Sequence, residues 1–529
     1  MKKRIVSVVL AMTMIFSLAA CGGNTKKEEQ KPAATKEEQK EEKKVKGGSL
    51  VMAVPGDMTT LNPAFDSGDE GKIMLEPVYD PLYVVNKDGV RYYLAESREV
   101  TDDGKTITVK LREGLKWHDG EPITADDLVW NIEFRKNPEN SSTKYALVKG
   151  NPVTAEKIDD LTVKVTLPDI SAAYDHLLGT IIMIPKHIYE NEANIKESEL
   201  NTTQSVGSGP YKMVEWNKGE SFVLERNDDY YKDVNLDSVV FKIIPVESAQ
   251  EVAFENGEIN VMRVSNAEMY EKYAADDRYQ MISMREGRVN YMQYNKNSEL
   301  TKDIRVREAI AKALNVQEIV DAAYGSDKLA VPAKNVFTEE NFYYADTPGY
   351  EQDVEEAKKL VSEVGLEGKT LRLIYNSSRP NMEDCALMIQ SQLKEVGVNV
   401  EITGYETQGF FEKFLRTDLG DWELGLNGYA TNTDNERCKN MWSGEGTMAR
   451  NVVATDEITQ LWKDGDGTIV PEKRAEIYKE LEQKIKDEYV VVPLSDTNYV
   501  MVADKNLRGL DAINMVPVFE DYTEIYMVE

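Results

Sequence analysis

Short stretches in which apolar and polar residues alternate predict half-buried β-strands in the first part of the chain. Residues 47–54 (GGSLVMAV) end in an apolar run that predicts a buried first strand. Further on, Ile107, Val109 and Leu111 alternate with polar residues, which is the two-residue period of a strand covered on one face. A helix is expected in residues 124–134 (TADDLVWNIEF), which open with a capping box, a threonine followed three residues later by an aspartate.

Helical and strand-like patterns take turns in the second half of the chain. Helices are predicted to start at Asp303 and at Asp353, each an N-cap candidate before apolar residues at three- and four-residue spacing. Residues 371–375 then alternate as a strand, residues 381–396 repeat as a helix, and residues 398–403 (VNVEIT) alternate again. Strand, helix and strand at this spacing indicate a βαβ unit with a parallel sheet. We therefore expect an α/β protein of two lobes, with its ligand bound between them.

The first residues have the pattern of a secretory signal. Residues 2–4 are basic and residues 5–20 are almost wholly apolar, a run shorter than the roughly 20 residues of a membrane-spanning helix. Its ending, Leu18 to Cys21 (LAAC), resembles the bacterial lipobox, in which the peptidase cuts before the cysteine and the thiol carries a lipid. We interpret residues 1–20 as a lipoprotein signal peptide and Cys21 as the lipidation site. An ordinary secretory signal with an incidental cysteine is the alternative.

Residues 21–46 are dominated by Lys and Glu and nearly lack large apolar side chains. Such a segment buries too little surface to offset chain entropy, so we expect a disordered tether. The formal net charge of −30 argues against nucleic acid as a partner, because phosphate binding needs a basic face. Lipidation would use one of the three cysteines, and we expect the other two, Cys385 and Cys438, to be buried free thiols.

The sequence lacks the common catalytic and metal-binding patterns. No HExxH or GxSxG occurs, and the three histidines, His118, His176 and His187, are too scattered to suggest a zinc or nickel site. We expect His118, in the WHDG stretch, to hold a turn. A carboxylate pair for sugar hydrolysis stays open in a chain with 93 acidic residues, although no pair stands out. We predict that the protein is not an enzyme and uses no metal or cofactor; a lipoprotein hydrolase is the alternative.

Four stretches together resemble the solute-binding proteins of peptide- and nickel-type ABC importers, known as extracellular solute-binding family 5. They occur in that family's order, and the resemblance is greatest to oligopeptide-binding members. It implies a receptor that captures a small solute, first of all an oligopeptide, between two closing lobes and delivers it to an ABC importer permease. The stretches are residues 111–130 (LREGLKWHDGEPITADDLVW), 184–190 (IPKHIYE), 206–231 (VGSGPYKMVEWNKGESFVLERNDDYY) and 306–325 (VREAIAKALNVQEIVDAAYG).

The resemblance also implies a domain organisation. The fold would be α/β of the periplasmic-binding-protein-like class II, with two lobes, a hinge, and a subdomain inserted in lobe one. The hinge would lie near residues 288–291 and 490–495, and the apolar C-terminal segment would return to lobe one as a strand. The receptor would be an extracytoplasmic monomer, held at the cell membrane of a Gram-positive bacterium by the lipid on Cys21. The implied ranges are 47–76, 189–288 and 493–529 for lobe one, 77–188 for the inserted subdomain, and 289–492 for lobe two.

The ligand site implied by the resemblance lies in residues 426–444 (LNGYATNTDNERCKNMWSG). In peptide-binding relatives a strand edge here pairs with the backbone of an extended peptide, and a carboxylate binds the α-ammonium group of the peptide. Gly428, Tyr429 and Ala430 match that edge. Asn432 stands where the ammonium-binding aspartate is expected, and an amide supplies no charge.

Asp434 is the acid that could take this role instead. It matches the Asp-Pro-Asp of a Gram-positive oligopeptide-binding subgroup, although Asn435 replaces the proline. A loop residue that bonds its own backbone is an equal alternative for Asp434.

The opposite wall of the site is expected just after the first strand, and an aromatic residue completes the predicted set. Tyr429, Trp422 and Trp442 keep an oligosaccharide ligand open, and family members also bind haem or nickel complexes. Ordinary packing is the alternative for Tyr429. The predicted residues outside the strand edge and its acids are Phe65, Asp66, Ser67, Gly68 and Trp442.

Overall fold

The structure is a computed structural model that describes residues 43–65, 68–140, 142–379, 381–418, 420–446, 448–511 and 518–529. The predicted signal peptide, Cys21, and all but the last residues of the predicted tether lie outside these ranges, as do Asp66 and Ser67. Within the described ranges, no helix combines the length and the apolar character needed to cross a membrane.

A mixed sheet of eleven strands dominates the described part of the chain. Its order is β11-β12-β13-β2-β14-β20-β15-β19-β17-β18, with β16 paired to β20 off this path. The strands are β2 (Ser49–Val54), β11 (Tyr211–Asn217), β12 (Ser221–Arg226), β13 (Ser238–Ile243), β14 (Val261–Arg263), β15 (Tyr279–Tyr294), β16 (Ala330–Pro332), β17 (Thr370–Asn376), β18 (Asn399–Tyr405), β19 (Leu424–Ala430) and β20 (Val491–Asp504).

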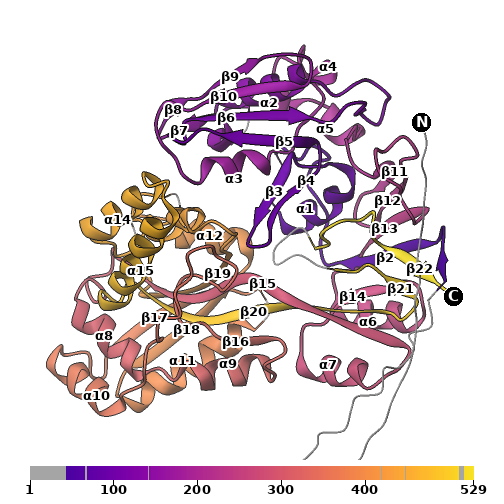
Figure 1. Ribbon diagram of the computed structural model, residues 1–529. Helices are drawn as coiled ribbons and strands as arrows, with labels where there is room; N and C mark the ends of the chain where they lie inside the picture. Colours follow the sequence, from indigo (N-terminus) through magenta and orange to yellow (C-terminus); the bar gives the residue numbers. More distant parts are fainter. Residues whose placement is uncertain are drawn as a thin grey trace, which may run out of the picture. The chain divides into compact units, whose positions relative to one another are not determined.

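The two longest strands, β15 and β20, are antiparallel neighbours near the middle of this sheet (Figure 1). The residues of β20 are buried almost throughout, which indicates a strand covered on both faces. A register shift lies between Arg285 and Arg288, where Gly287 has a φ of 59°. Glycine adopts this left-handed conformation at little cost, so it suits a β-bulge. Apart from Val490, both predicted hinge segments fall in these strands, where Tyr291 pairs with Pro493.

A separate four-stranded antiparallel sheet, β5-β6-β10-β9, has a hydrophobic core of its own that includes Ile107, Val109 and Leu111. The predicted capping box is confirmed, because Thr124 N donates to Asp127 Oδ2 (2.9 Å) at the start of α2 (Ala125–Glu133). The strands of this sheet and of two small hairpins are β3 (Tyr83–Asn86), β4 (Gly89–Tyr92), β5 (Ala95–Val100), β6 (Thr106–Leu111), β7 (Leu147–Val148), β8 (Asn151–Pro152), β9 (Thr154–Lys157) and β10 (Thr162–Thr166).

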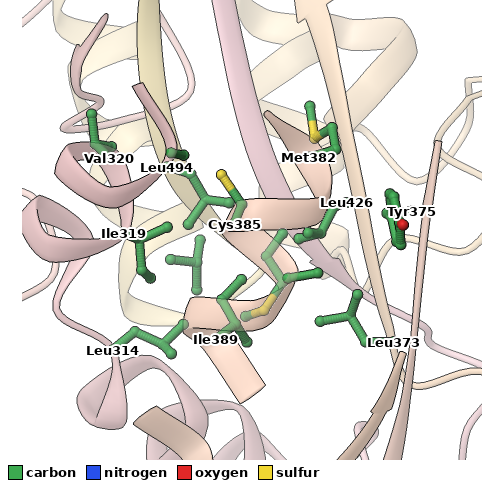
Figure 2. Close-up of a cluster of buried hydrophobic side chains, with 14 of the residues drawn as sticks. Leu314, Ile319, Val320, Leu373, Tyr375, Met382, Cys385, Ile389, Leu426 and Leu494 are labelled. Atoms are coloured by element: carbon green, nitrogen blue, oxygen red, sulfur yellow. The ribbon is translucent and has the colours of Figure 1, made fainter. Parts of the chain in front are cut away.

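The predicted βαβ unit is present as β17, α11 (Met382–Glu395) and β18, and the two strands are parallel. Helix α11 buries Cys385 and Ile389 in a hydrophobic core that includes residues of β17, β18 and β19. Figure 2 shows Leu373 of β17 and Leu426 of β19 in this core. A buried isoleucine such as Ile389 commonly contributes about 2–5 kcal/mol relative to alanine. Both Cys385 and Cys438 are buried free thiols, as the sequence predicts.

The helices begin where the sequence supplies caps. Asp303 and Asp353 each accept a bond from a backbone N–H in the first turn of α8 and α10, as predicted. Gly325 ends α9 in the left-handed conformation, with a φ of 68°. The remaining α-helices are α1 (Asp69–Leu75), α3 (Tyr174–Gly179), α4 (Lys186–Tyr189), α5 (Leu200–Thr203), α6 (Glu247–Glu255), α7 (Ala267–Ala274), α8 (Ile304–Ala313), α9 (Val316–Tyr324), α10 (Val354–Glu363), α12 (Thr407–Phe414), α13 (Lys439–Trp442), α14 (Asp456–Asp466) and α15 (Pro471–Asp487).

The C-terminal segment ends in strand β22 (Tyr526–Val528), as predicted, between β1 (Lys44–Val45) and β21 (Leu507–Arg508). Phe519 and Ile525 share a hydrophobic core with residues of β2. Apolar side chains of the two ends of the described chain therefore pack together.

Candidate ligand site

Strand β19 carries the predicted strand edge, and its two neighbours cover it unequally. It pairs with β15 from Leu424 to Ala430, but with β17 only from Leu424 to Leu426. The segment from Asn427 to Ala430 thus extends beyond the last residue paired with β17. Thr431 N donates to Gly287 O in the β15 bulge (2.7 Å). Since N–H groups alternate along a strand, those of Gly428 and Ala430 point to the side away from β15.

The Asn290 side chain approaches the backbone of Gly428 closely within the sheet. A Cβ atom at this position would lie 2.0 Å from Asn290 Oδ1. The Asn290 amide donates to the hydroxyls of Tyr324 (2.8 Å) and Ser495 (3.0 Å), so it is held in place. Glycine is therefore required here by packing.

The predicted aromatic residues lie in the core. Trp442 has no exposed surface and Tyr429 is 8% exposed. The Trp442 indole N–H donates to the Tyr429 hydroxyl (2.9 Å), which donates to Val336 O. Both rings contact Tyr291 edge to face. In this structure the side chains of Tyr429 and Trp442 pack in the core beside β19. Their assignment to the ligand site stays a prediction.

Asn432 has an unusual backbone conformation. It adopts a left-handed conformation with a φ of 59°, which asparagine tolerates better than most residues. The side-chain amide of Asn432 donates to Ala430 O (3.3 Å), and the backbone carbonyl oxygen of Asn432 accepts a bond from Asn341 Nδ2 (2.6 Å).

Asp434 is fully occupied by protein groups. Arg474 of α15 binds it bidentately, with Nη1 3.1 Å from Oδ2 and Nη2 3.0 Å from Oδ1. His176 Nδ1 of α3 donates to Oδ2 (3.0 Å), and Glu436 N donates to Oδ1 (3.0 Å). The last bond is the backbone capping that the sequence offered as the alternative for this residue. Burial by itself would raise the pKa of Asp434, but His176 and Arg474 hold it well below its usual range.

Further contacts join the same regions of the chain. Asp466 of α14 accepts bonds from the Ser171 hydroxyl (2.7 Å) and, through its backbone oxygen, from Ala172 N (2.9 Å). The Thr433 hydroxyl donates to Val85 O of β3 (3.2 Å). The segments around α3 and β3 therefore contact the loop that follows β19.

The predicted opposite wall is described at Phe65 and Gly68. Phe65 is partly buried against a small hydrophobic cluster, and Gly68 is the N-cap residue of α1. The next residue, Asp69, accepts a bond from Arg288 Nη2 (3.1 Å). Because Arg288 pairs with Ala430 in the sheet, this ion pair links α1 to the strand that carries the predicted edge.

Sequence reasoning missed a group of buried charges at the β15 bulge. Glu286 and Arg288 are 6% and 8% exposed and bond each other (2.9 Å). Burial would raise the pKa of Glu286, but Arg263 and Arg288 lower it to about 2. Charged residues that interrupt an apolar strand are unusual in a sequence, and this pattern of three (MREGRVNYMQY) could have marked Glu286 and Arg288.

Arg379 is a second residue that the sequence did not single out. It follows β17, and its Nε is buried with no hydrogen-bond partner among the described residues. Burial lowers its pKa, with Arg288 lowering it further and Asp69 raising it. A partly buried guanidinium with an unused Nε donor, shortly after the strand that pairs with the start of β19, can bind an anionic group.

The histidines behave as structural residues. Gly207 N donates to His118 Nδ1 (3.1 Å) and His118 Nε2 donates to Gly209 O (3.0 Å), so His118 holds a turn, as predicted. Burial lowers the pKa of His118 to about 4. No cluster of three metal-ligating side chains occurs among the described residues.

The chain matches the bacterial extracellular solute-binding proteins of family 5 over residues 89–446. It is 28% identical over 490 residues to the oligopeptide-binding protein AppA of Bacillus subtilis, covering 88% of this chain and 89% of that protein. It is 26% identical over 500 residues to the dipeptide-binding protein of Escherichia coli, covering 88% and 92%.

Solved structures of solute-binding proteins are similar to this chain as well. The ABC transporter substrate-binding protein CtaP of Listeria monocytogenes is 34% identical with a TM-score of 0.86, over 92% of this chain and 100% of that chain. A putative peptide-binding protein AppA of Clostridium difficile is 36% identical with a TM-score of 0.83, over 91% and 100%. These neighbours have the two-lobe α/β fold that the sequence predicts. Proteins of this kind are extracytoplasmic binding receptors of ABC importers and not enzymes. The chain belongs to family 5 of the bacterial extracellular solute-binding proteins.

Proposed function

We propose that this receptor binds an oligopeptide in extended form along the open edge of β19. The observation that carries the proposal is the unequal pairing of that strand. Gly428 and Ala430 direct backbone groups away from β15, at a place where β17 has ceased to pair. An added peptide strand satisfies such groups without reading side chains, which suits a receptor for mixed sequences.

Arg379 supplies a charge for one end of the peptide. Its buried Nε has no partner among the described residues, and Arg288 and Asp69 lie near it. The terminal carboxylate is the anionic group that every free peptide carries. We assign Arg379 to that carboxylate, and Phe65, Asp66, Ser67 and Gly68 to the facing wall.

Relatives support the peptide assignment over the other solutes of the family. The Bacillus subtilis AppA structure, 25% identical with a TM-score of 0.79 over 92% of this chain, is described in complex with a nonapeptide. A haem-binding protein of Haemophilus influenzae is also related, at 24% identity over 79% of this chain. The peptide-binding relatives have the higher identities and cover more of the chain.

We further propose the division into lobes given by the sequence: 47–76, 189–288 and 493–529 for lobe one with 77–188 inserted, and 289–492 for lobe two. The strands β15 and β20 cross between these ranges and serve as the hinge.

A lipid on Cys21 holds the receptor at the cell membrane near its permease. Replacing Cys21 by Ser is expected to release the protein into the medium of the producing bacterium, whereas retention on membranes contradicts the anchor.

Native mass spectrometry of the gently purified full chain tests the ligand class. The released solute is then sequenced by tandem mass spectrometry. A mixed set of short peptides is the expected result, and their lengths define the site. An oligosaccharide, a haem or a metal chelate in their place overturns the peptide proposal while leaving the receptor function intact.

A further inference from the structure

Asp496 is a buried carboxylate that the protein only partly satisfies. It lies on β20, opposite Val289 of β15 and Val331 of β16. The residue is 7% exposed, and its Oδ1 has no hydrogen-bond partner among the described residues. Its Oδ2 lies 3.4 Å from Arg285 Nη1, a long contact. That arginine is itself 30% exposed at the side chain and also faces Glu339 at 3.9 Å.

Glu340 is a second carboxylate of the same kind. It is 7% exposed, and its Oε2 has no partner among the described residues. The neighbouring residue Asn341 donates to Asn432 O, and Thr338 bonds Thr431 through their hydroxyls (3.0 Å). Glu340 therefore belongs to a segment fastened to the loop that follows the open edge of β19.

Asp496 lies in an acidic environment to which Glu340 contributes. Burial raises the pKa of Asp496 to about 7, Arg285 opposes this, and Glu340, Glu339 and Glu286 raise it further. Arg285, which contacts Asp496, is shared with Glu339, while Arg263 and Arg288 pair with Glu286. A buried anion without a full set of donors is costly in a folded protein. Burial of two such oxygens therefore points to a donor that a ligand brings.

We propose that Asp496 and Glu340 bind a protonated primary amine of the solute. An ammonium group carries one charge and three donors, which matches carboxylate oxygens that are buried and lack a partner among the described residues. The position fits, because the segment of Glu340 contacts the loop at Asn432, where the α-ammonium is expected. Asp434 already binds Arg474 and His176, so its carboxylate has no free capacity. This inference deepens the proposed function and rests on it.

A selectivity measurement on the full chain tests the amine site. The protein is stripped of co-purified solute in denaturant, refolded, and offered a synthetic pool of short peptides with free amino termini, or the same pool after N-acetylation. Retained peptides are counted by mass spectrometry. We expect the wild type to prefer the free pool by at least about tenfold, as a charge-assisted bond implies.

The variants locate that preference. Asp496→Asn and Glu340→Gln should bring the ratio of free to acetylated peptides close to one. Glu339→Gln is the matched control, because its side chain is 62% exposed in the same segment, and it should keep the wild-type ratio. A preference that survives in both Asp496→Asn and Glu340→Gln overturns the site.

A second probe separates this inference from the peptide proposal. Glycinamide, a small primary amine, and N-acetylglycinamide are titrated while the thermal midpoint is followed. We expect glycinamide to stabilise the wild type and Glu339→Gln saturably, and this stabilisation to be lost in Asp496→Asn. That result supports the amine site even if neither peptide pool is retained. Failure to retain either pool rejects only the oligopeptide proposal. Equal responses to the two amides overturn the amine site.

Discussion

Asp434 and Asp496 are both buried aspartates near the proposed ligand site, one in the loop after β19 and one within β20, yet their surroundings are opposite. Asp434 is 2% exposed and receives a bidentate arginine, a histidine and a backbone N–H. Asp496 is 7% exposed and has one long contact to Arg285, with its other oxygen unpartnered. The difference teaches that the number of donors, rather than burial, separates a carboxylate that stabilises the fold from one that is available to a ligand.

The pKa values express the same difference. Partners depress the pKa of Asp434 against the effect of burial, whereas burial and neighbouring acids raise that of Asp496 to about 7. Asp434 is therefore ionised over the physiological range, and Asp496 changes charge within it.

Removing the cation from each aspartate is expected to give the largest contrast. Arg474→Ala leaves Asp434 buried and unpaired, which should lower the free energy of unfolding by about 3–5 kcal/mol. Arg285→Ala removes only a long, partly exposed contact of Asp496 and should cost less than about 1 kcal/mol. Urea denaturation at neutral pH measures both values. Lys473→Ala, an exposed neighbour of Arg474 on α15, is the control and should be near wild type. Equal losses in the two arginine variants contradict the comparison.

The pH dependence of stability should differ in sign between the two aspartates. The folded-state pKa of Asp496 is raised, so its contribution is most favourable at low pH and is lost as pH rises from about 4 to about 7. Each pKa unit corresponds to about 1.4 kcal/mol, and relaxation with solvent screening should leave roughly 2–3 kcal/mol of the shift. Asp496→Asn should therefore gain stability relative to wild type over this range.

Asp434 is expected to behave in the opposite way. Its folded-state pKa is depressed, so its stabilisation is present above about pH 4 and is lost as the pH falls below that value. Asp434→Asn should thus be less stable than wild type at pH 7, with a difference that shrinks in acid. Urea denaturation across pH 3–8 measures both variants, and parallel pH profiles would remove the distinction between the two sites.

The sequence predicts elements whose signals are local. The capping box at Thr124 involves residues three apart, and the βαβ unit between Thr370 and Tyr405 is read from periodicity alone. The same holds for the N-caps at Asp303 and Asp353. The caps lie within one helical turn, and each element of the βαβ unit has its own periodicity, so these patterns are visible in the chain.

The proposed ligand site depends on contacts that no local pattern contains. Arg474 is 40 residues from Asp434, and His176 is 258 residues from it. A resemblance to relatives located the loop after β19 but could not show that its acid is already paired. Nor could it single out Asp496 and Glu340, because an acid in a chain this rich in acids carries information only once its burial and partners are known.

The smallest expected effect concerns the histidine that joins α3 to Asp434. His176→Ala removes one bond of 3.0 Å from a side chain that is 22% exposed, while Arg474 keeps the aspartate paired. The free energy of unfolding should fall by only about 0.5–1 kcal/mol. Since the bond joins regions proposed to belong to different lobes, the same energy lowers the ratio of closed to open molecules without solute about two- to fivefold. Small-angle scattering of solute-free protein measures this change, with His187→Ala as the control because His187 pairs with Asp119 within the predicted inserted subdomain. If the two variants scatter alike, His176 adds nothing to closure, and Arg474 alone distinguishes Asp434 from Asp496.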